Sequence, residues 1–433
     1  MKQDEYQRRR KALKDMMGDH CIAIIPSASE QVRNRDVLYP FRQDSDFQYL
    51  TGFPEPDAVA VLVPGREHGE FILFCREKDP AKETWDGYRA GQEGAMRDYG
   101  ADDSFPIDDV DDILPGLMER CEKVFCTMGE HPDFDQRVLS WVNQLRQGAR
   151  AGTRAPTEFV ALEHLLHEMR LFKHKADVTA MRHAAKISIE AHQDAMRICR
   201  PGMMEYEVEA ALINRFKSYG TEPAYPSIVG GGANGCVLHY ISNNAKLRDG
   251  DLLLIDAGTE FDCYASDITR TFPVNGRYSG PQRDVYQLVL DAQLAAIEEV
   301  QPGKSWNDFH ERAVQVLTQG LVDLKLLEGN VDGLIESQAY RRFYMHRTGH
   351  WLGMDVHDVG DYKVDDEWRI LEPGMVLTVE PGLYITAADD VDERFHNIGI
   401  RIEDDVLVTK QGHDVLTEAM PKRVDDVEAL MAG

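Results

Sequence analysis

The sequence predicts a protein of two domains that both combine helices with strands. At 433 residues the chain is longer than most single domains. Residues 1–170 contain short apolar runs separated by polar and turn-rich segments, which predicts an α/β domain. Further along, strand-like runs alternate with long helix-like segments, which predicts an α+β domain over residues 171–433.

Each domain has its own series of expected elements. Apolar runs at 21–25, 58–63 and 70–75 predict strands of the first domain. Residues 162–196 repeat apolar side chains at helical spacing and predict one long helix that leads into the second domain. In the second domain, expected strands at 251–258 and 374–382 flank an expected helix at 283–300.

Composition excludes several classes of function. The formal net charge of −27 argues against nucleic acid as a partner, because phosphate binding needs a basic surface. It favours cationic substrates instead, such as the free N-terminus of a peptide. No apolar run reaches the roughly 18 residues of a membrane span, and the charged first residues do not resemble an export signal. Seven cysteines without a C-x-x-C pair argue against a disulfide framework, so we expect a cytoplasmic protein.

Three features look functional but have simpler explanations. Residues 230–235, GGGANG, fit a dinucleotide-binding pattern, but the following CVLHYI predicts a strand where that motif needs a helix. Residues 102–112 are acidic but lack the glycine and glutamate of a calcium loop, so a solvated acidic surface is expected. His164 and His167 lie three apart on an expected helix without nearby carboxylates, which predicts packing or surface roles.

The stretch HRTGHWLGMDVHD, residues 346–358, holds three of the fifteen histidines of the chain, His346, His350 and His357. Neutral imidazole binds metals and transfers protons near pH 7. A histidine can equally occupy a core position with one hydrogen bond satisfied. The stretch alone leaves both possibilities open, so its partners must be sought elsewhere in the chain.

Two aspartates provide the first candidate partners. Asp256 interrupts an otherwise apolar strand, and a buried aspartate is costly unless it is paired or bound to a metal. If Phe261 and Asp262 form the loop of a hairpin, Asp256 and Asp267 face each other on one side of the sheet. Two carboxylates so placed can share a pair of metal ions, whereas two exposed aspartates on a hairpin remain the simpler alternative.

Two glutamates extend the set. Glu380 ends the expected strand MVLTVE just before a Pro-Gly turn. In residues 397–408 the isoleucines at 398, 400 and 402 alternate with Gly399, Arg401 and Glu403, which places Arg401 and Glu403 on the face away from the core. Four carboxylates and one imidazole suit Mn²⁺, and less exclusively Co²⁺ or Zn²⁺.

These residues, in this order, resemble those of the metallopeptidases with the pita-bread fold, a family that includes methionine aminopeptidase, prolidase and aminopeptidase P. The resemblance covers LLLIDAG, YASDITRTF, HRTGHWLGMDVHDVG, GMVLTVEPGLYI and GIRIEDD. The N-terminal domain carrying YPFRQDSDFQYLTGF and the segment IVGGGANGCVLHY narrow it toward the bacterial aminopeptidase P group. The resemblance implies an α/β N-terminal domain for oligomerisation and site access, followed by a pita-bread catalytic domain.

The resemblance also implies roles for individual residues. Two divalent ions, Mn²⁺ above all, would be held by a set of five side chains: Asp256, Asp267, His350, Glu380 and Glu403. Glu380 would also act as general base. The family's substrate-contacting and supporting residues would correspond to His239, His357, His346, Tyr225 and Arg401.

The implied reaction is hydrolysis of the bond between the first residue of a peptide and a proline at position two. A homotetramer is implied as well, in which Trp85 of one subunit reaches a neighbour's site; ordinary packing is the alternative for Trp85. The nearest rival function is that of prolidase, which cleaves Xaa-Pro dipeptides. A peptide-binding module on an inactive peptidase fold is a rival of another class, but it would be expected to lack metal ligands.

Overall fold

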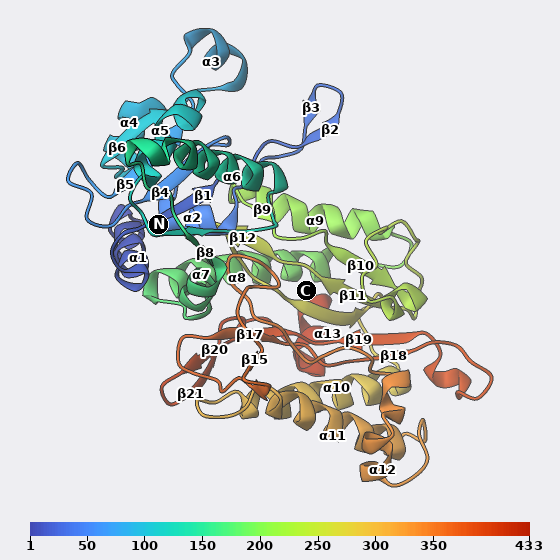
Figure 1. The fold of residues 1–433 in the computed structure, drawn as a ribbon. Coiled ribbons are helices and arrows are strands. Elements are labelled where there is room, and N and C mark those ends of the chain that lie inside the picture. Colours follow the sequence, from blue (N-terminus) through green and yellow to red (C-terminus); the bar gives the residue numbers. More distant parts are fainter. The chain divides into compact units, whose positions relative to one another are not determined.

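The computed structural model describes residues 1–433, which divide into two compact units, Met1–Arg170 and Leu171–Gly433 (Figure 1). Each unit has its own buried apolar clusters. None of the helices combines the length and the apolar character needed to cross a bilayer.

The first unit is built on one mixed six-stranded sheet in the order β6-β5-β4-β1-β7-β8. Strand β1 is antiparallel to β4 and parallel to β7. The strands are β1 (Cys21–Pro26), β4 (Val59–Leu62), β5 (Phe71–Cys75), β6 (Asp103–Pro106), β7 (Lys123–Cys126) and β8 (Glu158–Ala161). The helices are α1 (Gln3–Met17), α2 (Ser45–Thr51), α3 (Pro80–Asp86), α4 (Gly91–Tyr99), α5 (Val110–Met118), α6 (Pro132–Gln147) and α7 (Glu163–Leu171).

The sheet of this unit forms around the predicted strands, because the strands observed at all three predicted apolar runs are buried along their whole length. Their side chains pack against α5 and α6, where Trp141 is 2% exposed. A short hairpin, β2 (Val32–Asn34) with β3 (Val37–Leu38), and helix α3 project from the body of the unit (Figure 1). Both carry exposed apolar side chains, and Trp85 on α3 is 87% exposed.

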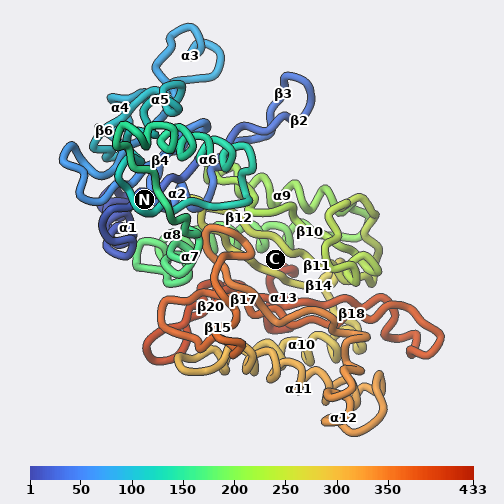
Figure 2. The backbone as a smooth tube through the Cα atoms, viewed as in Figure 1, coloured from blue at the N-terminus to red at the C-terminus, as the bar shows by residue number.

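The second unit places small sheets between two layers of helices. Helices α8 (Lys175–Ile198) and α9 (Glu205–Ser218) lie on one side of the strands, and α10 (Gly280–Glu299) and α11 (Asp308–Asp323) lie on the other (Figures 1 and 2). Helices α12 (Val331–Glu336) and α13 (Val424–Ala432) complete the set.

The strands of the second unit pair in five small sheets, whose orders are β10-β11-β14, β13-β12-β9, β17-β20-β21, β18-β19 and β15-β16. The strands are β9 (Glu222–Pro223), β10 (Ile228–Gly231), β11 (Leu252–Asp256), β12 (Thr259–Phe261), β13 (Tyr264–Ala265), β14 (Thr269–Pro273), β15 (Lys363–Val364), β16 (Glu367–Trp368), β17 (Val376–Val379), β18 (Gly382–Ile385), β19 (Ile398–Arg401), β20 (Asp404–Thr409) and β21 (Gly412–Val415).

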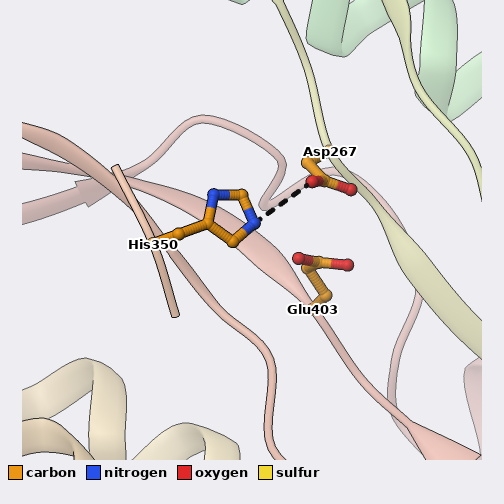
Figure 3. A group of neighbouring side chains, drawn as sticks. All are labelled: Asp267, His350 and Glu403. Carbon is orange, nitrogen blue, oxygen red and sulfur yellow. Dashed lines mark ion pairs between the residues drawn. The ribbon is translucent and has the colours of Figure 1, made fainter. Parts of the chain in front are cut away.

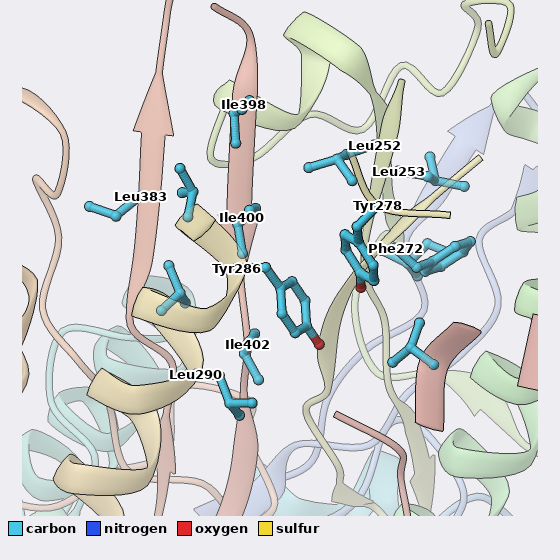
Figure 4. Close-up of a cluster of buried hydrophobic side chains, with 14 of the residues drawn as sticks. Leu252, Leu253, Phe272, Tyr278, Tyr286, Leu290, Leu383, Ile398, Ile400 and Ile402 are labelled. Carbon is cyan, nitrogen blue, oxygen red and sulfur yellow. The ribbon is translucent and has the colours of Figure 1, made fainter. Parts of the chain in front are cut away.

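The core of this unit explains which faces of the strands turn toward the site. Ile398, Ile400 and Ile402 are buried beside Tyr286 of α10, as their alternation predicts (Figure 4). The residues between them therefore face the opposite side, where the carboxylates gather. Helix α10 begins at a capping box in which Ser279 and Gln282 exchange hydrogen bonds.

Two predicted elements differ from the structure. The single helix expected over 162–196 is wrong, because Phe172–His174 separate α7 from α8. The Lys173 amide donates to the carbonyl of Gly374 and its ammonium pairs with Asp358, while the Asp177 carboxylate caps α8 at the His174 amide. These contacts outweigh the helical periodicity. The strand expected over 236–241 is also wrong, since a 3₁₀ turn at Gly232–Cys236 leads into irregular chain.

The hairpin that carries the two aspartates turns one residue later than predicted. Asp262 and Cys263 both have positive φ, as the two central residues of a type I′ turn do, and Phe261 pairs with Tyr264. Asp256 is consequently paired with Thr269 rather than with Asp267. The register prediction is wrong by two residues.

Candidate active site

Asp267, His350 and Glu403 form the centre of a buried polar cluster, with ligand atoms that all lie within 4.8 Å of one another (Figure 3). Asp267 lies between β13 and β14, and Glu403 lies in the break between β19 and β20. The structure thus brings together residues that the chain separates widely. Asp256 and Glu380 line the same cavity, so all five predicted ligands share one site.

Asp256 and Asp267 converge despite the shifted register, because a shift of two residues keeps a side chain on the same face of a strand. The hydroxyl oxygen of Tyr225 lies 2.7 Å from Oδ1 of Asp256 and 2.5 Å from Oδ1 of Asp267. A tyrosine has one hydroxyl proton, so it can donate a hydrogen bond to only one of the two carboxylates at a time. Gly258 permits the two segments that carry Asp256 and Asp267 to lie close together, since a Cβ at Gly258 would lie 1.7 Å from the Ser266 carbonyl oxygen.

The orientation of His350 leaves one ring nitrogen facing the carboxylates. Its Nδ1 donates to the carbonyl of Trp351 at 3.0 Å. Its Nε2 lies 3.5 Å from Asp267 Oδ2 and 3.8 Å from Glu380 Oε1. Burial disfavours the imidazolium, but Asp267 and Glu380 outweigh this and raise the pKa of His350 to about 9. A backbone bond that fixes one nitrogen while the other points at acidic groups is typical of a metal-binding histidine.

The surroundings of the two glutamates favour the neutral carboxyl over the carboxylate. Burial first, and then the charges of Asp267 and Asp256, raise the pKa of Glu380 to about 7 despite the opposing effects of His350 and Arg401. Burial, together with the charges of Asp267, Glu380 and Asp256, raises the pKa of Glu403 well above its usual range. Both groups lack sufficient positive charge nearby.

Arg401 connects the metal-ligand candidates to the aromatic side of the site. Its guanidinium donates to Asp256 Oδ2 at 2.6 Å, to Tyr384 Oη at 2.8 Å and to Thr269 Oγ1 at 3.1 Å. The Thr269 hydroxyl donates in turn to Glu403. The Tyr384 hydroxyl lies 2.8 Å from Nε2 of His346, whose Nδ1 donates to the Arg347 carbonyl. Arg401 therefore orients both carboxylates and the Tyr384 hydroxyl.

His357 and His239 lie at the open side of the cluster. The ring of His357 stands edge-on to that of His350, with centroids 4.3 Å apart. His357 and His239 are both exposed, and both line the cavity of about 970 Å³ that contains the five candidate ligands. Burial and the neighbouring His350 lower the pKa of His357, which favours the neutral ring. Trp85 belongs to the other unit, where it is exposed on α3.

A buried carboxylate fixes the loop that carries His239. Glu205, at the start of α9, is fully buried and accepts four hydrogen bonds. Its oxygens accept from the amide of Gly231 at 2.8 Å, Asn234 Nδ2 at 3.0 Å, Tyr240 Oη at 2.8 Å and the amide of Ala245 at 2.8 Å. The loop from 231 to 245 is thereby closed around one side chain.

The donor set fits divalent cations. Two buried and two partly buried carboxylates crowd around a single arginine and one histidine, and the raised pKa values of Glu380 and Glu403 report the missing positive charge. Carboxylate oxygens with one imidazole suit Mn²⁺, Co²⁺ or Zn²⁺ better than metals that prefer sulfur. The cluster is acidic enough to hold two such ions.

Three residues of the site were not predicted from the sequence. Tyr384 was missed. It lies two residues after Gly382, which pairs with Arg401 across β18 and β19, so its side chain points to the same face of this sheet as that of Arg401. Glu205 and Asp405 were missed as well, and Asp405 is fully buried beside the Asp267 amide at 3.2 Å. A buried acid has no local sequence signal, because its partners come from distant parts of the chain.

The geometry agrees with comparisons to known proteins. Residues 179–410 match the model of metallopeptidase family M24, and residues 6–125 match the aminopeptidase P N-terminal domain. The chain belongs to metallopeptidase family M24, and its fold is the pita-bread fold preceded by this N-terminal domain.

Similarity to individual members extends over the whole chain. It is 44% identical to the Xaa-Pro aminopeptidase of Escherichia coli over 99% of this chain and 97% of that protein. The solved structure of the Pseudomonas aeruginosa aminopeptidase PepP is 58% identical and covers 100% of this chain and 98% of that one, with a TM-score of 0.99. A zinc-substituted Escherichia coli aminopeptidase P solved with product is 44% identical, with the same coverage of both chains and a TM-score of 0.97.

Proposed function

We propose that this protein is a dimetal aminopeptidase that removes the first residue of a peptide when proline is the second. The observation that carries the proposal is the cluster of Asp256, Asp267, His350, Glu380 and Glu403 in one cavity. Full-length relatives named Xaa-Pro aminopeptidase support this substrate class and give no support to the prolidase alternative. The presence of all five candidate ligands weighs against an inactive peptide-binding module.

The five clustered side chains would hold two divalent ions, with Mn²⁺ as the metal that we propose. Such ions would supply a polarised scissile carbonyl and an attacking water of lowered pKa. The zinc-substituted relative supports divalent ions in general, and the oxygen-rich donor set supports Mn²⁺ in particular.

The chain's own residues would bind the substrate and move its protons. The bond to proline is a tertiary amide without an N–H, so recognition rests on the ring and on the free amine. The acidic cluster attracts that amine, and Asp256 is the carboxylate that we assign to it. Glu380 would accept a proton from water and pass it to the departing proline nitrogen, because its carboxylate lies in the cluster beside His350.

The two exposed histidines would contact the peptide on the open side of the cluster. His357, beside His350, would donate to the oxygen that becomes negative as water attacks. His239 would bind the carbonyl beyond the proline, held in place by the loop that Glu205 closes. Tyr225, His346 and Arg401 would orient these groups rather than react.

We also propose a cytoplasmic homotetramer in which Trp85 enters the site of a neighbouring subunit. Trp85 on the projecting helix α3 and Tyr88 just after it are 87% and 97% exposed, and two large aromatic side chains presented together support an intermolecular role. All seven cysteines are free thiols, which supports a reducing compartment.

The test is a competition among Xaa-Pro-Xaa, Xaa-Pro and Xaa-Ala-Xaa under one set of conditions with Mn²⁺. The proposal predicts the highest kcat/KM for the tripeptide with proline. Faster cleavage of the dipeptide would assign a prolidase, and equal cleavage of the alanine peptide would exclude a proline-specific pocket.

A further inference from the structure

The wall of the substrate cavity contains one arginine that makes no ion pair. Two arginines line the cavity, Arg347 and Arg401. Arg401 is committed to Asp256 and Tyr384, as described above. Arg347 is exposed and forms no ion pair, although the charge of Glu311 acts on its guanidinium from beyond ion-pair distance. An unpaired cation is unusual in a chain of net charge −27.

Arg347 is held in a fixed position by two neutral groups. Its guanidinium carbon lies 4.8 Å from the centroid of the Trp368 ring, which also lines the cavity. Its Nη2 donates to Oδ1 of Asn307 at 2.6 Å. The amide of Asn307 donates to Glu311, so the orientation of its oxygen toward Arg347 is fixed as well. The cation is thus pre-organised, while most of its five N–H donors stay available.

The charged groups that line the cavity act in opposite ways on the two termini of a peptide. Carboxylates of the candidate metal site occupy one part of the wall and attract the free amine of a peptide. The same carboxylates repel the peptide's other terminus. A bound carboxylate would find its charge partner at Arg347, because Arg401 is already occupied. The planar guanidinium can bind a carboxylate through two parallel hydrogen bonds.

We propose that Arg347, supported by Trp368, is a specificity-determining residue that binds a carboxylate on the substrate beyond the proline. This inference rests on the proposed function. The carboxylate is either the C-terminus of a short peptide or an acidic side chain after the proline. An arginine that only packs against the Trp368 ring would instead not distinguish charged from neutral substrates.

The experiment compares Arg347→Gln with the unchanged protein on three Xaa-Pro-Xaa peptides. One peptide has a free C-terminal carboxylate, the second is its C-terminal amide, and the third is an amide with glutamate at position three. Arg347→Gln keeps the backbone carbonyl that receives the His346 hydrogen bond. We expect KM to rise about tenfold for the free acid, with kcat and the KM of the neutral amide unchanged.

Lys363→Gln provides the matched control. Its ammonium lies 4.7 Å from the centroid of the same Trp368 ring, yet Lys363 does not line the cavity. This variant removes one positive charge beside the indole and should leave KM for all three peptides unchanged. An equal change with Lys363→Gln would attribute the effect to general electrostatics and overturn the proposal.

The three peptides also separate the possible results. A KM increase for the glutamate-containing amide supports the proposal and adds acidic side chains to the carboxylates recognised. Equal losses for all three peptides, or no loss for any of them, would overturn it. If the unchanged protein cleaves none of the Xaa-Pro peptides, the proposed function itself fails, which is a separate result.

Discussion

Arg401 donates a 2.6 Å hydrogen bond from Nη2 to Oδ2 of Asp256, although 145 positions separate the two residues in the chain. The pair is almost fully buried, with 4% of the Arg401 side chain and 13% of the Asp256 side chain exposed. The contact orients Asp256 toward the other carboxylates. It also restrains the Asp256 side chain, so that its carboxylate stays directed toward a cation bound among them.

Arg401→Lys should therefore weaken the site although it keeps the charge. A lysine cannot reproduce the three hydrogen bonds to Asp256, Tyr384 and Thr269. We expect a loss of about 10- to 100-fold in activity or metal affinity, as found for groups that orient metal ligands. Measurements of kcat/KM and bound metal check this. Arg394→Lys, at an exposed ion pair, is the control, and equal behaviour of both variants would contradict the role of Arg401.

His357→Ala should separate chemistry from metal binding. His357 contacts the His350 ring but lies outside the five candidate ligands, so its loss should leave metal content near normal. We expect kcat to fall by about 10²- to 10³-fold, the magnitude typical of a lost oxyanion donor. Metal analysis beside steady-state kinetics provides the check. Loss of metal in this variant would make His357 a ligand instead.

Glu205→Gln should loosen the loop that carries His239. The amide replaces one accepting oxygen by a donor, so donors from the 231–245 loop lose their partner at a cost of about 1–3 kcal/mol. Hydrogen exchange at the amide of Ala245 should quicken, and KM should rise for peptides that extend beyond proline. Glu207→Gln, on the same helix but exposed at the Met204 amide, is the matched control. Unchanged protection at Ala245 would refute the positioning role of Glu205.

Gly258→Ala should destabilise the second unit. A methyl group at Gly258 would meet the Ser266 carbonyl oxygen at 1.7 Å and push apart the segments that carry Asp256 and Asp267. We expect a decrease of roughly 1–3 kcal/mol in the free energy of unfolding, together with weaker metal binding. Gly333→Ala has no atom within 4 Å of its new methyl group and serves as the control in denaturant unfolding. Equal stability of the two variants would contradict the close approach.

Residue types and strand periodicity indicated the four carboxylates, whereas the resemblance to the pita-bread metallopeptidases was needed to choose His350 among the three histidines of residues 346–358. The prediction that Asp256 and Asp267 converge survived an error of two residues in register, because side chains on a strand repeat their direction every two residues. The alternation of Ile398, Ile400 and Ile402 likewise placed Glu403 away from the core. Local patterns therefore identify which face a residue takes even where they misplace a turn.

Long-range contacts account for what the sequence could not reveal. The helix break at Lys173 depends on Gly374 and Asp358, which lie about 200 positions further along the chain. The role of Glu205 depends equally on a distant loop that supplies four donors. The position of Arg347 also differs from what the overall charge of the chain predicts. The net charge of −27 favours cationic substrates, but Arg347 places a local positive charge in the wall of the cavity.

Metal dependence tests the central claim most directly, since the claim is that four carboxylates and His350 exist to hold two divalent ions. The measurement is Xaa-Pro-Xaa cleavage by protein whose metal has been removed with a chelator, during titration with Mn²⁺, with bound metal determined on the same samples. The account predicts no activity without metal and full recovery at two ions per chain. Full activity in a sample verified to be free of metal would contradict it.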